Sequence, residues 1–246
     1  MDTGTQNAAC NMALEKVLLA SCADGTAPNT LHFLEFLPCV LLGYSQSAAD
    51  EVDRKFCIEN GVEINRRISG GGAIYMDSGT LGWEIIAKKR TPGIPGNIED
   101  MYRKLCGGTI LALSKFGLDA SFRPINDIEI GGRKISGAGG TELEDSFIFH
   151  GTVLVDSNAD VMVKALKFPA AKLKYKQVSD FKKRTVCMRE LLGYIPAMAD
   201  VKERLSTAFA ETLNVEIRKG EMLGKEIEML DMELPWFSSD QWIYGK

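Results

Sequence analysis

The stretch Arg66-Arg67-Ile68-Ser69-Gly70-Gly71-Gly72-Ala73-Ile74-Tyr75 places two arginines directly before three consecutive glycines, with β-prone residues on both sides. Consecutive glycines cost backbone entropy, so a chain keeps them where φ must be positive or where the backbone must approach another group closely. Their N–H groups can surround a phosphate or a carboxylate, and planar guanidinium groups match such oxyanions. The pattern predicts an anion-binding loop between two strands. The alternative is a glycine-rich hairpin whose arginines are solvated.

A second stretch, from Asn126 to Gly140, predicts a hairpin that carries a lysine. Apolar and polar residues alternate before Gly131-Gly132, which is typical of a tight turn between two strands. Lys134 would then lie on the second strand, and a loop of small residues is expected at Ser136 to Gly140. A lysine between two glycine-rich loops suits a negatively charged or carbonyl-bearing ligand. A solvated strand lysine and a plain turn at Asn126-Asp127 remain open.

Together the two stretches resemble the lipoate-protein ligase A family, within the larger group of biotin and lipoate ligases and octanoyltransferases. In that family an RRxSGGGAVYHD-type loop precedes an ND segment, a GRKISG strand and a HGT strand. The counterparts follow in the same order: Arg66 to Asp77, Asn126-Asp127, Gly132 to Gly137 and His150-Gly151-Thr152. The resemblance continues in an NMALE helix start at Asn11 and a closing Ser-Ser-Asp-Gln-Trp at Ser238 to Trp242, so it spans nearly the whole chain.

The resemblance implies an enzyme that activates lipoate (or octanoate) with ATP to lipoyl-AMP and transfers the acyl group to a lysine of a lipoyl carrier protein. It assigns catalysis to Lys134, Asp127 and Arg67. Lys134 would hold the carboxyl oxygen and the phosphate, and Arg67 with the glycine-loop backbone would hold the acyl phosphate. Asp127 would either approach Mg²⁺ and the phosphates, as the metal ligand, or help to deprotonate the acceptor lysine. The expected substrate and nucleotide contacts are Ser69, Gly71, Gly72, Ala73, Ile74, Tyr75, Thr80, Asn126, Ser136, Gly137, Ala138, His150, Gly151 and Thr152.

Two features depart from the family pattern. Met76 stands where histidine is common and Thr80 where asparagine is common, so the contacts to the nucleotide are expected to differ. The chain ends about where the large catalytic domain of single-chain ligases ends. It therefore resembles the catalytic half of a split ligase, one domain over residues 1–246 whose activation step needs a small accessory subunit. A finer resemblance, at Pro38 to Gly43 and Leu81 to Ile85, is to a branch associated with lipoate-binding proteins of bacterial sulfur oxidation.

Three other functions compete with this one. An octanoyltransferase of the same fold needs an activated cysteine, which related enzymes place before the lysine strand, where Arg123 to Asp127 contains none. A non-catalytic lipoate-binding protein would not need a phosphate-binding loop beside Lys134 and Asp127. A biotin ligase would carry a GRGRxxR-type loop, which this sequence lacks.

The sequence leaves two further ligand contacts open: those around the aliphatic tail of lipoate and the contact of His150. The aliphatic tail of lipoate is expected in a tunnel formed by Leu18, Trp83 and Val153, although these residues need no role beyond the core. His150 is either a pocket contact or a satisfied core histidine.

Composition excludes several classes of protein. A chain of 246 residues with 45% hydrophobic content can bury a sizeable core. No apolar run approaches the ~20 residues of a membrane span, and the N-terminus shows no basic region of a signal peptide. A cytoplasmic protein without a membrane partner is therefore expected. The net charge of -4 argues against a nucleic-acid partner. Two histidines and six cysteines without a Cys-x-x-Cys pair predict no zinc site, and the thiols are expected to be structural.

Periodicity predicts an α+β fold, with a mixed or antiparallel sheet flanked by helices, because helices and strands do not alternate in a strict βαβ order. The first expected helix begins at a cap on Asn11. Further helices are expected over 50–60, 98–116, 160–167 and 201–213. The expected strands cover 31–37, 40–42, 62–67, 82–87, 147–155 and 215–217, and they are expected to form one sheet. The lysine-rich segment 172–184 is either a solvated face or a basic loop that closes over the ligand.

Overall fold

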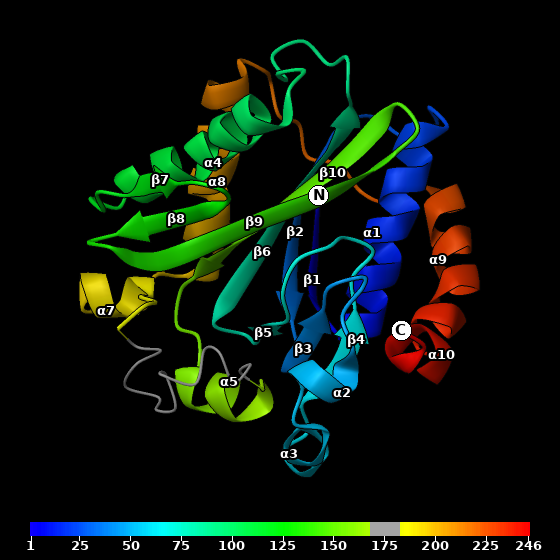
Figure 1. The fold of residues 1–246 in the computed structure, drawn as a ribbon. Helices are drawn as coiled ribbons and strands as arrows, with labels where there is room; N and C mark the ends of the chain where they lie inside the picture. The colour runs from blue at the N-terminus through cyan, green and yellow to red at the C-terminus, as the bar shows by residue number, and fades with distance from the viewer. Residues whose placement is uncertain (168–182) are drawn as a thin grey trace.

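The computed structural model describes residues 1–167 and 183–246, and a seven-stranded sheet forms its centre (Figure 1). In spatial order the strands are β1 (Asp2–Gln6), β2 (Thr30–Phe36), β6 (Thr80–Lys88), β10 (Ser146–Leu154), β9 (Arg133–Leu143), β8 (Asp127–Ile130) and β7 (Ser121–Arg123). β1 and β2 are parallel, and the other neighbours are antiparallel. The predicted α+β class with a mixed sheet is confirmed.

A second sheet carries the glycine loop. It has three strands in the order β4-β3-β5: β4 (Glu63–Arg66), β3 (Cys39–Leu42) and β5 (Ile74–Met76). The expectation of a single sheet is therefore wrong. Pro38 separates β3 from β2, and proline cannot donate to a strand ladder. Because β4 and β5 lie on opposite sides of β3, the loop 67–73 crosses from one side of β3 to the other.

Helices cover both faces of the large sheet (Figure 1). On one face, α1 (Ala8–Ala23) packs against the sheet and against α9 (Gly224–Phe237). On the other face, α4 (Ile98–Ser114) packs against α8 (Met198–Leu213) and over an aromatic core. The shorter helices are α2 (Ala48–Glu51), α3 (Arg54–Glu59), α5 (Ala159–Ala165), α7 (Met188–Leu192) and α10 (Asp240–Tyr244).

The alternation of side chains along β6 separates the two faces. Trp83 and Ile85 belong to the core under α4 and α8, where Trp83 lies 4.8 Å from the ring of Phe209. Ile86 packs in a smaller cluster with residues of α1. Successive residues of a strand point to opposite faces, so Glu84 also lies on the α1 side. This division decides which predicted site residues can reach one ligand.

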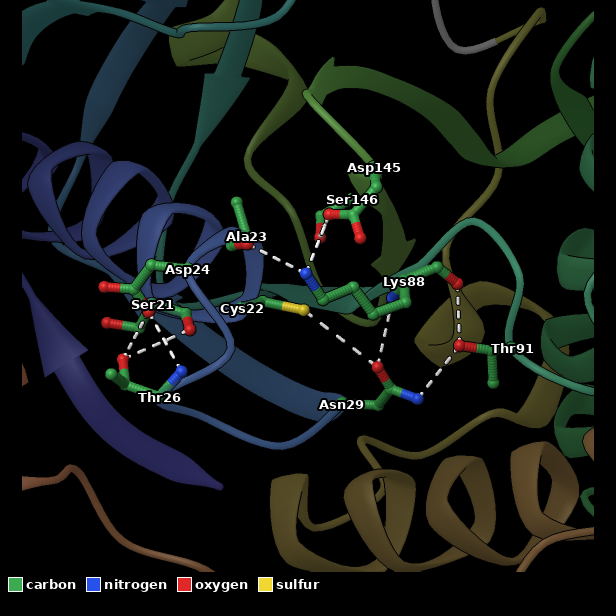
Figure 2. Close-up of polar contacts among 10 residues, drawn as sticks. All are labelled: Ser21, Cys22, Ala23, Asp24, Thr26, Asn29, Lys88, Thr91, Asp145 and Ser146. Carbon is green, nitrogen blue, oxygen red and sulfur yellow. Dashed lines mark hydrogen bonds and ion pairs between the residues drawn. The ribbon is translucent and has the colours of Figure 1, made fainter.

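Polar contacts fix the end of α1 over the end of the sheet (Figure 2). Lys88 Nζ donates to the carbonyl of Ala23 at 2.8 Å and pairs with the Asp145 carboxylate at 2.7 Å. The side chain of Asn29 accepts from the Lys88 N–H at 3.0 Å and donates to Thr91 at 3.0 Å. The end of α1, the starts of β2 and β10 and the end of β6 are thereby held together.

Several local expectations are wrong. Asn7 caps α1 by accepting from a main-chain N–H at 2.8 Å, whereas Asn11 is buried inside the helix and donates to a carbonyl of β2. Residues 215–217 form no strand. Ser136 to Gly140 form no loop, because they continue the long strand β9, which pairs there first with β8 and then with β10.

Other expectations hold with shifted ends. The helix expected over 50–60 is two helices, α2 and α3, because Val52 leaves the helix to form a β-bridge with Leu166. The hairpin at Gly131-Gly132 is confirmed, with φ of 57° and 76° at the two glycines. Most of the segment 172–184 lies outside the described residues. Within them, no helix is both long and apolar enough to cross a membrane.

Candidate functional site

The two stretches that the sequence analysis singled out meet at one cavity of about 560 Å³. It lies between the glycine loop on one side and the strands β9 and β10 on the other. The predicted site residues that line it are Arg67, Gly71, Gly72, Ala73, Ile74, Tyr75, Thr80, Asn126, Lys134, Ser136, Gly137, Ala138, His150 and Thr152. Residues far apart in the sequence thus contribute to a single pocket.

The glycine loop packs tightly on the segment after β3. Gly71 has φ of 101°, a left-handed conformation that favours glycine. A Cβ added at Gly43 would lie 2.0 Å from the carbonyl oxygen of Gly71, so residue 43 must also be glycine. The N–H of Tyr44 donates to the carbonyl of Ser69 at 2.9 Å. The segment 43–46 therefore supports the loop from behind.

The two arginines do not present free guanidinium groups to the cavity. Arg66 is fully buried, lies outside the cavity and donates to main-chain carbonyls, so the expectation that it would bind an oxyanion is wrong. Arg67 lines the cavity but donates to the carbonyls of Leu41, Gly70 and Gly72 at 2.8, 3.2 and 2.9 Å. Arg67 therefore braces the glycine loop. Its Nε is buried without a hydrogen-bond partner among the described residues.

Lys134 and Asp127 form an ion pair at the site. Lys134 Nζ lies 2.6 Å from Asp127 Oδ1, and both side chains are partly exposed. The segment 184–186 fixes the backbone of Lys134. The Lys134 N–H donates to the carbonyl of Arg184 at 2.7 Å, and the Lys134 carbonyl accepts from the N–H of Val186 at 2.9 Å. A Cβ at Gly137 would lie 2.6 Å from Lys134 Nζ. The Lys134 side chain passes directly over Gly137 to reach Asp127, and a side chain at residue 137 would occupy the same space.

Asn126 fixes the strand that follows the lysine. Its side-chain N–H donates to the carbonyl of Ala138 at 2.6 Å, and its own carbonyl accepts from the Ala138 N–H at 2.9 Å. Thr152 Oγ1 accepts from the N–H of Gly137 at 3.5 Å. Ser136 Oγ is buried and has no hydrogen-bond partner among the described residues.

His150 connects the sheet to the glycine loop. Its Nε2 lies 2.7 Å from Ser69 Oγ, which explains the place of Ser69 just behind the cavity wall. Burial, and next the nearby Arg67 charge, lower the pKa of His150 to about 3. The imidazole is therefore neutral at physiological pH. A neutral ring can position Ser69 and a ligand, but it adds no charge to the site.

Four of the residues that were predicted to form or extend the pocket lie on the opposite face of the sheet or on another element. A Cβ at Gly151 would lie 2.3 Å from the Trp83 ring, on the α4 side. Trp83 and Val153 belong to the same core, and Leu18 packs in a separate cluster on α1. The expected tunnel of Leu18, Trp83 and Val153 is therefore wrong. The apolar wall of the cavity is formed by Met76, Tyr102, Leu154, Met162 and Leu166.

The sequence contained a partial signal for this wall. Leu154 follows Thr152 at the strand period of two and so lies on the same face of β10. Met162 lies in α5 and Leu166 directly follows it. Their place in the wall depends on how α5 packs against the cavity, which a local sequence pattern does not show.

The cysteines are placed away from the cavity. All six are free thiols, and none is among the described residues that line it. Burial raises the pKa of Cys57 to about 11 and that of Cys106 to about 12. A raised pKa keeps a thiol protonated and unreactive at neutral pH. The expectation of structural thiols fits this arrangement.

The site offers little to a tightly bound metal. Within the described residues, no group of three or more histidine, cysteine, aspartate or glutamate side chains converges on one point. Asp127 is one carboxylate, already paired with Lys134. Mg²⁺ is often held by one or two carboxylates together with substrate phosphates and water, so Asp127 fits a site that is completed by a nucleotide.

Comparison with known proteins places this geometry among lipoate enzymes. The chain is 27% identical to the octanoyltransferase LipM of Kyrpidia tusciae, over 100% of this chain and 98% of the relative. It is 28% identical to lipoate-protein ligase A subunit 1 of Thermoplasma acidophilum, over 97% of this chain and 93% of the relative.

Solved structures have the same fold. A crystal structure of lipoate-protein ligase A bound with ATP is 25% identical and superimposes with a TM-score of 0.85, covering 100% of this chain and 96% of that chain. The bi-partite lipoate protein ligase of T. acidophilum, studied with its E2 lipoyl domain, is 24% identical with a TM-score of 0.83, covering 100% of this chain and 97% of that chain.

The family model of the lipoyl protein ligase A/B catalytic domain matches residues 7–210, which include the glycine loop, the Lys134 hairpin and the His150 strand. This match covers most of the chain. The chain therefore belongs to the lipoyl protein ligase A/B catalytic domain family, whose members include lipoate-protein ligases and octanoyltransferases.

Proposed function

We propose that this protein is the catalytic subunit of an ATP-dependent lipoate-protein ligase. It would convert lipoate, or octanoate, to the acyl-adenylate and transfer the acyl group to a lysine of a lipoyl carrier protein. One observation carries the proposal: Lys134 pairs with Asp127 at 2.6 Å beside a cavity that is walled by the glycine loop and, among the described residues, contains no cysteine. Such a site suits charge stabilisation rather than thiolate catalysis.

In the activation step, ATP supplies the α-phosphate that the lipoate carboxylate attacks, and pyrophosphate leaves. Negative charge on the phosphoryl oxygens is then stabilised by cations and by fixed N–H groups. Lys134 and the glycine loop line the same cavity, so the Lys134 ammonium, once it leaves Asp127, and the loop N–H groups would stabilise this charge. Leu154, Met162 and Leu166 would surround the aliphatic chain of the acyl group.

In the transfer step, the amine of the acceptor lysine attacks the acyl carbon, AMP leaves, and the amine must lose a proton. Lys134 would stay on the carboxyl oxygen and the phosphate, which raises the electrophilicity of the carbon and stabilises the departing AMP. Once Lys134 turns to the ligand, the Asp127 carboxylate is released from the 2.6 Å ion pair. It can then accept the amine proton or, with the phosphates, hold Mg²⁺. Mg²⁺ would neutralise phosphate charge, with Asp127 as its protein ligand.

A second candidate, an octanoyltransferase, is favoured by the full-length similarity to LipM. That reaction would require a nucleophilic thiolate within reach of the acyl group. The cysteines of this chain lie elsewhere, and burial raises the pKa of the deepest ones. A non-catalytic lipoate-binding protein is the remaining alternative.

The partners follow from the proposed reaction. We propose a lipoyl carrier domain as acceptor and a small accessory subunit for activation, since a relative of nearly the same length is called subunit 1 and comes from a bi-partite ligase. Residues 1–246 would form one catalytic domain in the cytoplasm. A link to sulfur oxidation stays a prediction from the sequence resemblance.

Intact-mass analysis of a lipoyl carrier domain tests the proposal. The carrier is incubated with this protein and, in separate reactions, with ATP plus lipoate, with chemically made lipoyl-adenylate, or with an octanoyl carrier-protein thioester. We expect a gain of one lipoyl group from the adenylate, and from ATP plus lipoate at least when the accessory subunit is added. Transfer from the thioester alone would instead identify an octanoyltransferase. Binding of the adenylate without any transfer would identify a binding protein.

Lys134→Ala is the decisive variant. We expect it to lower the rate of transfer from lipoyl-adenylate by about 100-fold to 1,000-fold, as for other groups that stabilise developing charge. Lys89→Ala is the matched control, because Lys89 forms a surface ion pair with Glu142 and lies outside the cavity. Equal transfer rates in the two variants would show that Lys134 has no role in the transfer step.

A further inference from the structure

The side chain of Arg66 joins two parts of the chain that are far apart in sequence. Its Nε and Nη2 donate to the carbonyls of Trp242 and Ile243 at 3.0 and 2.7 Å. Its Nη1 donates to the carbonyls of Gly43, Tyr44 and Gln46 at 3.0, 2.9 and 2.7 Å. The side chain is fully buried, and all five of these acceptors are main-chain oxygens. A planar fork with five donors can hold two separate backbone segments at once.

On one side, Arg66 completes the end of a C-terminal helix. The last carbonyls of a helix have no partner within the helix and carry its negative dipole end, so a cation there is favourable. Trp242 returns the contact, because its Nε1–H donates to the carbonyl of Arg66 at 3.0 Å. The neighbouring Asn65 side chain donates to the carbonyl of Phe237 at 2.9 Å. Ser239 caps α10 by accepting from the Trp242 N–H.

Trp242 of the closing Ser-Ser-Asp-Gln-Trp motif and the first arginine of the glycine motif therefore meet in one buried contact. The sequence suggested oxyanion binding for Arg66 and no role for the closing motif beyond the family resemblance. Their contact joins the helices α9 and α10 to the last residues of β4, directly before the glycine loop.

On the other side, Arg66 holds the support of the glycine loop. The segment 43–46 that it binds donates from Tyr44 to the carbonyl of Ser69 and presses Gly43 against the carbonyl of Gly71. Ser69 in turn contacts His150 at the cavity wall. An uninterrupted series of contacts therefore runs from α10 through Arg66 and segment 43–46 to the loop that lines the cavity.

We infer that Arg66 is a positioning residue through which the C-terminal helices fix the glycine loop and so set the affinity of the cavity for the acyl-adenylate. Arg66 does not touch the ligand, because it lies outside the cavity. The identity of the ligand rests on the proposed function, whereas the coupling between α10 and the loop does not. A residue with a purely structural role would lower the stability of the whole molecule without selectively loosening the loop.

Trp242→Phe is the least disruptive test. It keeps an aromatic ring against Phe237 and removes the hydrogen bond to the Arg66 carbonyl. Val201→Ala is the matched control, because Val201 is a buried α8 residue in the core on the other face of the sheet. The melting temperature, amide hydrogen exchange, the affinity for lipoyl-adenylate and the rate of transfer at saturation are measured for both variants. Arg66→Lys, which keeps the charge and loses the fork, is measured as well.

We expect Trp242→Phe and Arg66→Lys to speed exchange at 43–46 and 69–73 by at least 10-fold and to weaken adenylate binding about 10-fold. The transfer rate at saturation should change less than 2-fold. Val201→Ala should leave exchange at these segments and the affinity unchanged at a comparable loss in melting temperature. Equal exchange in Trp242→Phe and Val201→Ala would overturn the coupling. If the unmodified protein fails to bind lipoyl-adenylate, the proposed function fails while the exchange comparison still decides the coupling.

Discussion

At the scale of single residues, Lys134 reaches Asp127 because residue 137 has no side chain. A Cβ at Gly137 would lie 2.6 Å from Lys134 Nζ and 2.8 Å from its Cε. The far end of a lysine can move at little cost in folding free energy, so Gly137→Ala should shift the ammonium group without unfolding the protein. A displacement of about 1 Å can cost about 100-fold in rate. We therefore expect transfer from lipoyl-adenylate to slow by about that factor, as measured by single-turnover mass analysis.

Gly107→Ala is the control for this variant. Gly107 lies in α4, and a Cβ there meets open space. Alanine in a helix is favoured over glycine by about 0.5–1 kcal/mol, so this variant should be slightly more stable and fully active. If Gly137→Ala also keeps full activity, the position of Lys134 is not critical for transfer.

The two arginines show why residue roles were harder to predict than residue positions. The order of motifs located Arg67 and Lys134 at one site, since each motif is local in sequence. The partners of Arg66 are carbonyls at 43–46 and at 242–243, up to 177 residues away. Every residue type has a main-chain carbonyl, so the sequence does not reveal which carbonyls an arginine will bind. It therefore could not show whether the Arg66 guanidinium binds buried carbonyls or an anionic ligand.

At the scale of elements, the glycine loop depends on its fit against segment 43–46. A Cβ at Gly43 would lie 2.0 Å from the Gly71 carbonyl oxygen, and neither backbone can yield easily. Overpacking of this kind typically costs about 1–3 kcal/mol. We expect Gly43→Ala to lower the melting temperature by several degrees and to weaken adenylate binding at least 10-fold, measured by calorimetry and by titration.

Gly220→Ala provides the comparison, because a Cβ at Gly220 meets open space and the residue lies outside the cavity. It should change neither the melting temperature nor the affinity by a measurable amount. Tight binding retained by Gly43→Ala would mean that the loop can adopt its ligand-binding form without support from 43–46.

Elements were predicted well where their signals were local. The Gly131-Gly132 hairpin, α4 and β10 follow from turn residues and from periodicity within a few residues. The continuation of β9 through Ser136 to Gly140 was missed, because small residues in a strand look like a loop until the partner strand is known. The C-terminal helices α9 and α10 were not predicted.

At the scale of the whole molecule, a row of titratable groups crosses the sheet on the face that α1 covers, from two buried residues to one at the cavity. His32, Glu84 and His150 are cross-strand neighbours on β2, β6 and β10. His32 Nδ1 lies 3.1 Å from Glu84 Oε2, and Nε2 lies 2.9 Å from Thr3 Oγ1. Burial raises the pKa of Glu84 to about 8 and lowers that of His32 to about 3. Both groups are therefore neutral near pH 7, with the Glu84 carboxyl protonated.

These shifts predict how the free energy of unfolding depends on pH. The folded protein keeps the Glu84 proton up to about pH 8, whereas the unfolded chain releases it near the ordinary value, so this contribution to stability is lost as pH rises toward 8. Burial also raises the pKa of Glu15, which adds to the loss. The lowered pKa values of His32 and His150 act in the opposite direction, because the unfolded chain binds protons below about pH 6.5.

Above pH 6.5 the histidine contribution fades, and the Met1 amino group, whose pKa is lowered by burial, partly opposes the carboxyl contribution. One pKa unit corresponds to about 1.4 kcal/mol, so Glu84 alone should lower the free energy of unfolding by roughly 2 kcal/mol across this range. Glu84→Gln stays neutral and should remove that slope, whatever its effect on stability at pH 6.5. Glu142→Gln, at a half-exposed surface ion pair, should keep the slope of the unmodified protein. Urea unfolding at several pH values measures all three proteins, and parallel curves for Glu84→Gln and the unmodified protein would show that the Glu84 carboxyl is not protonated in the fold.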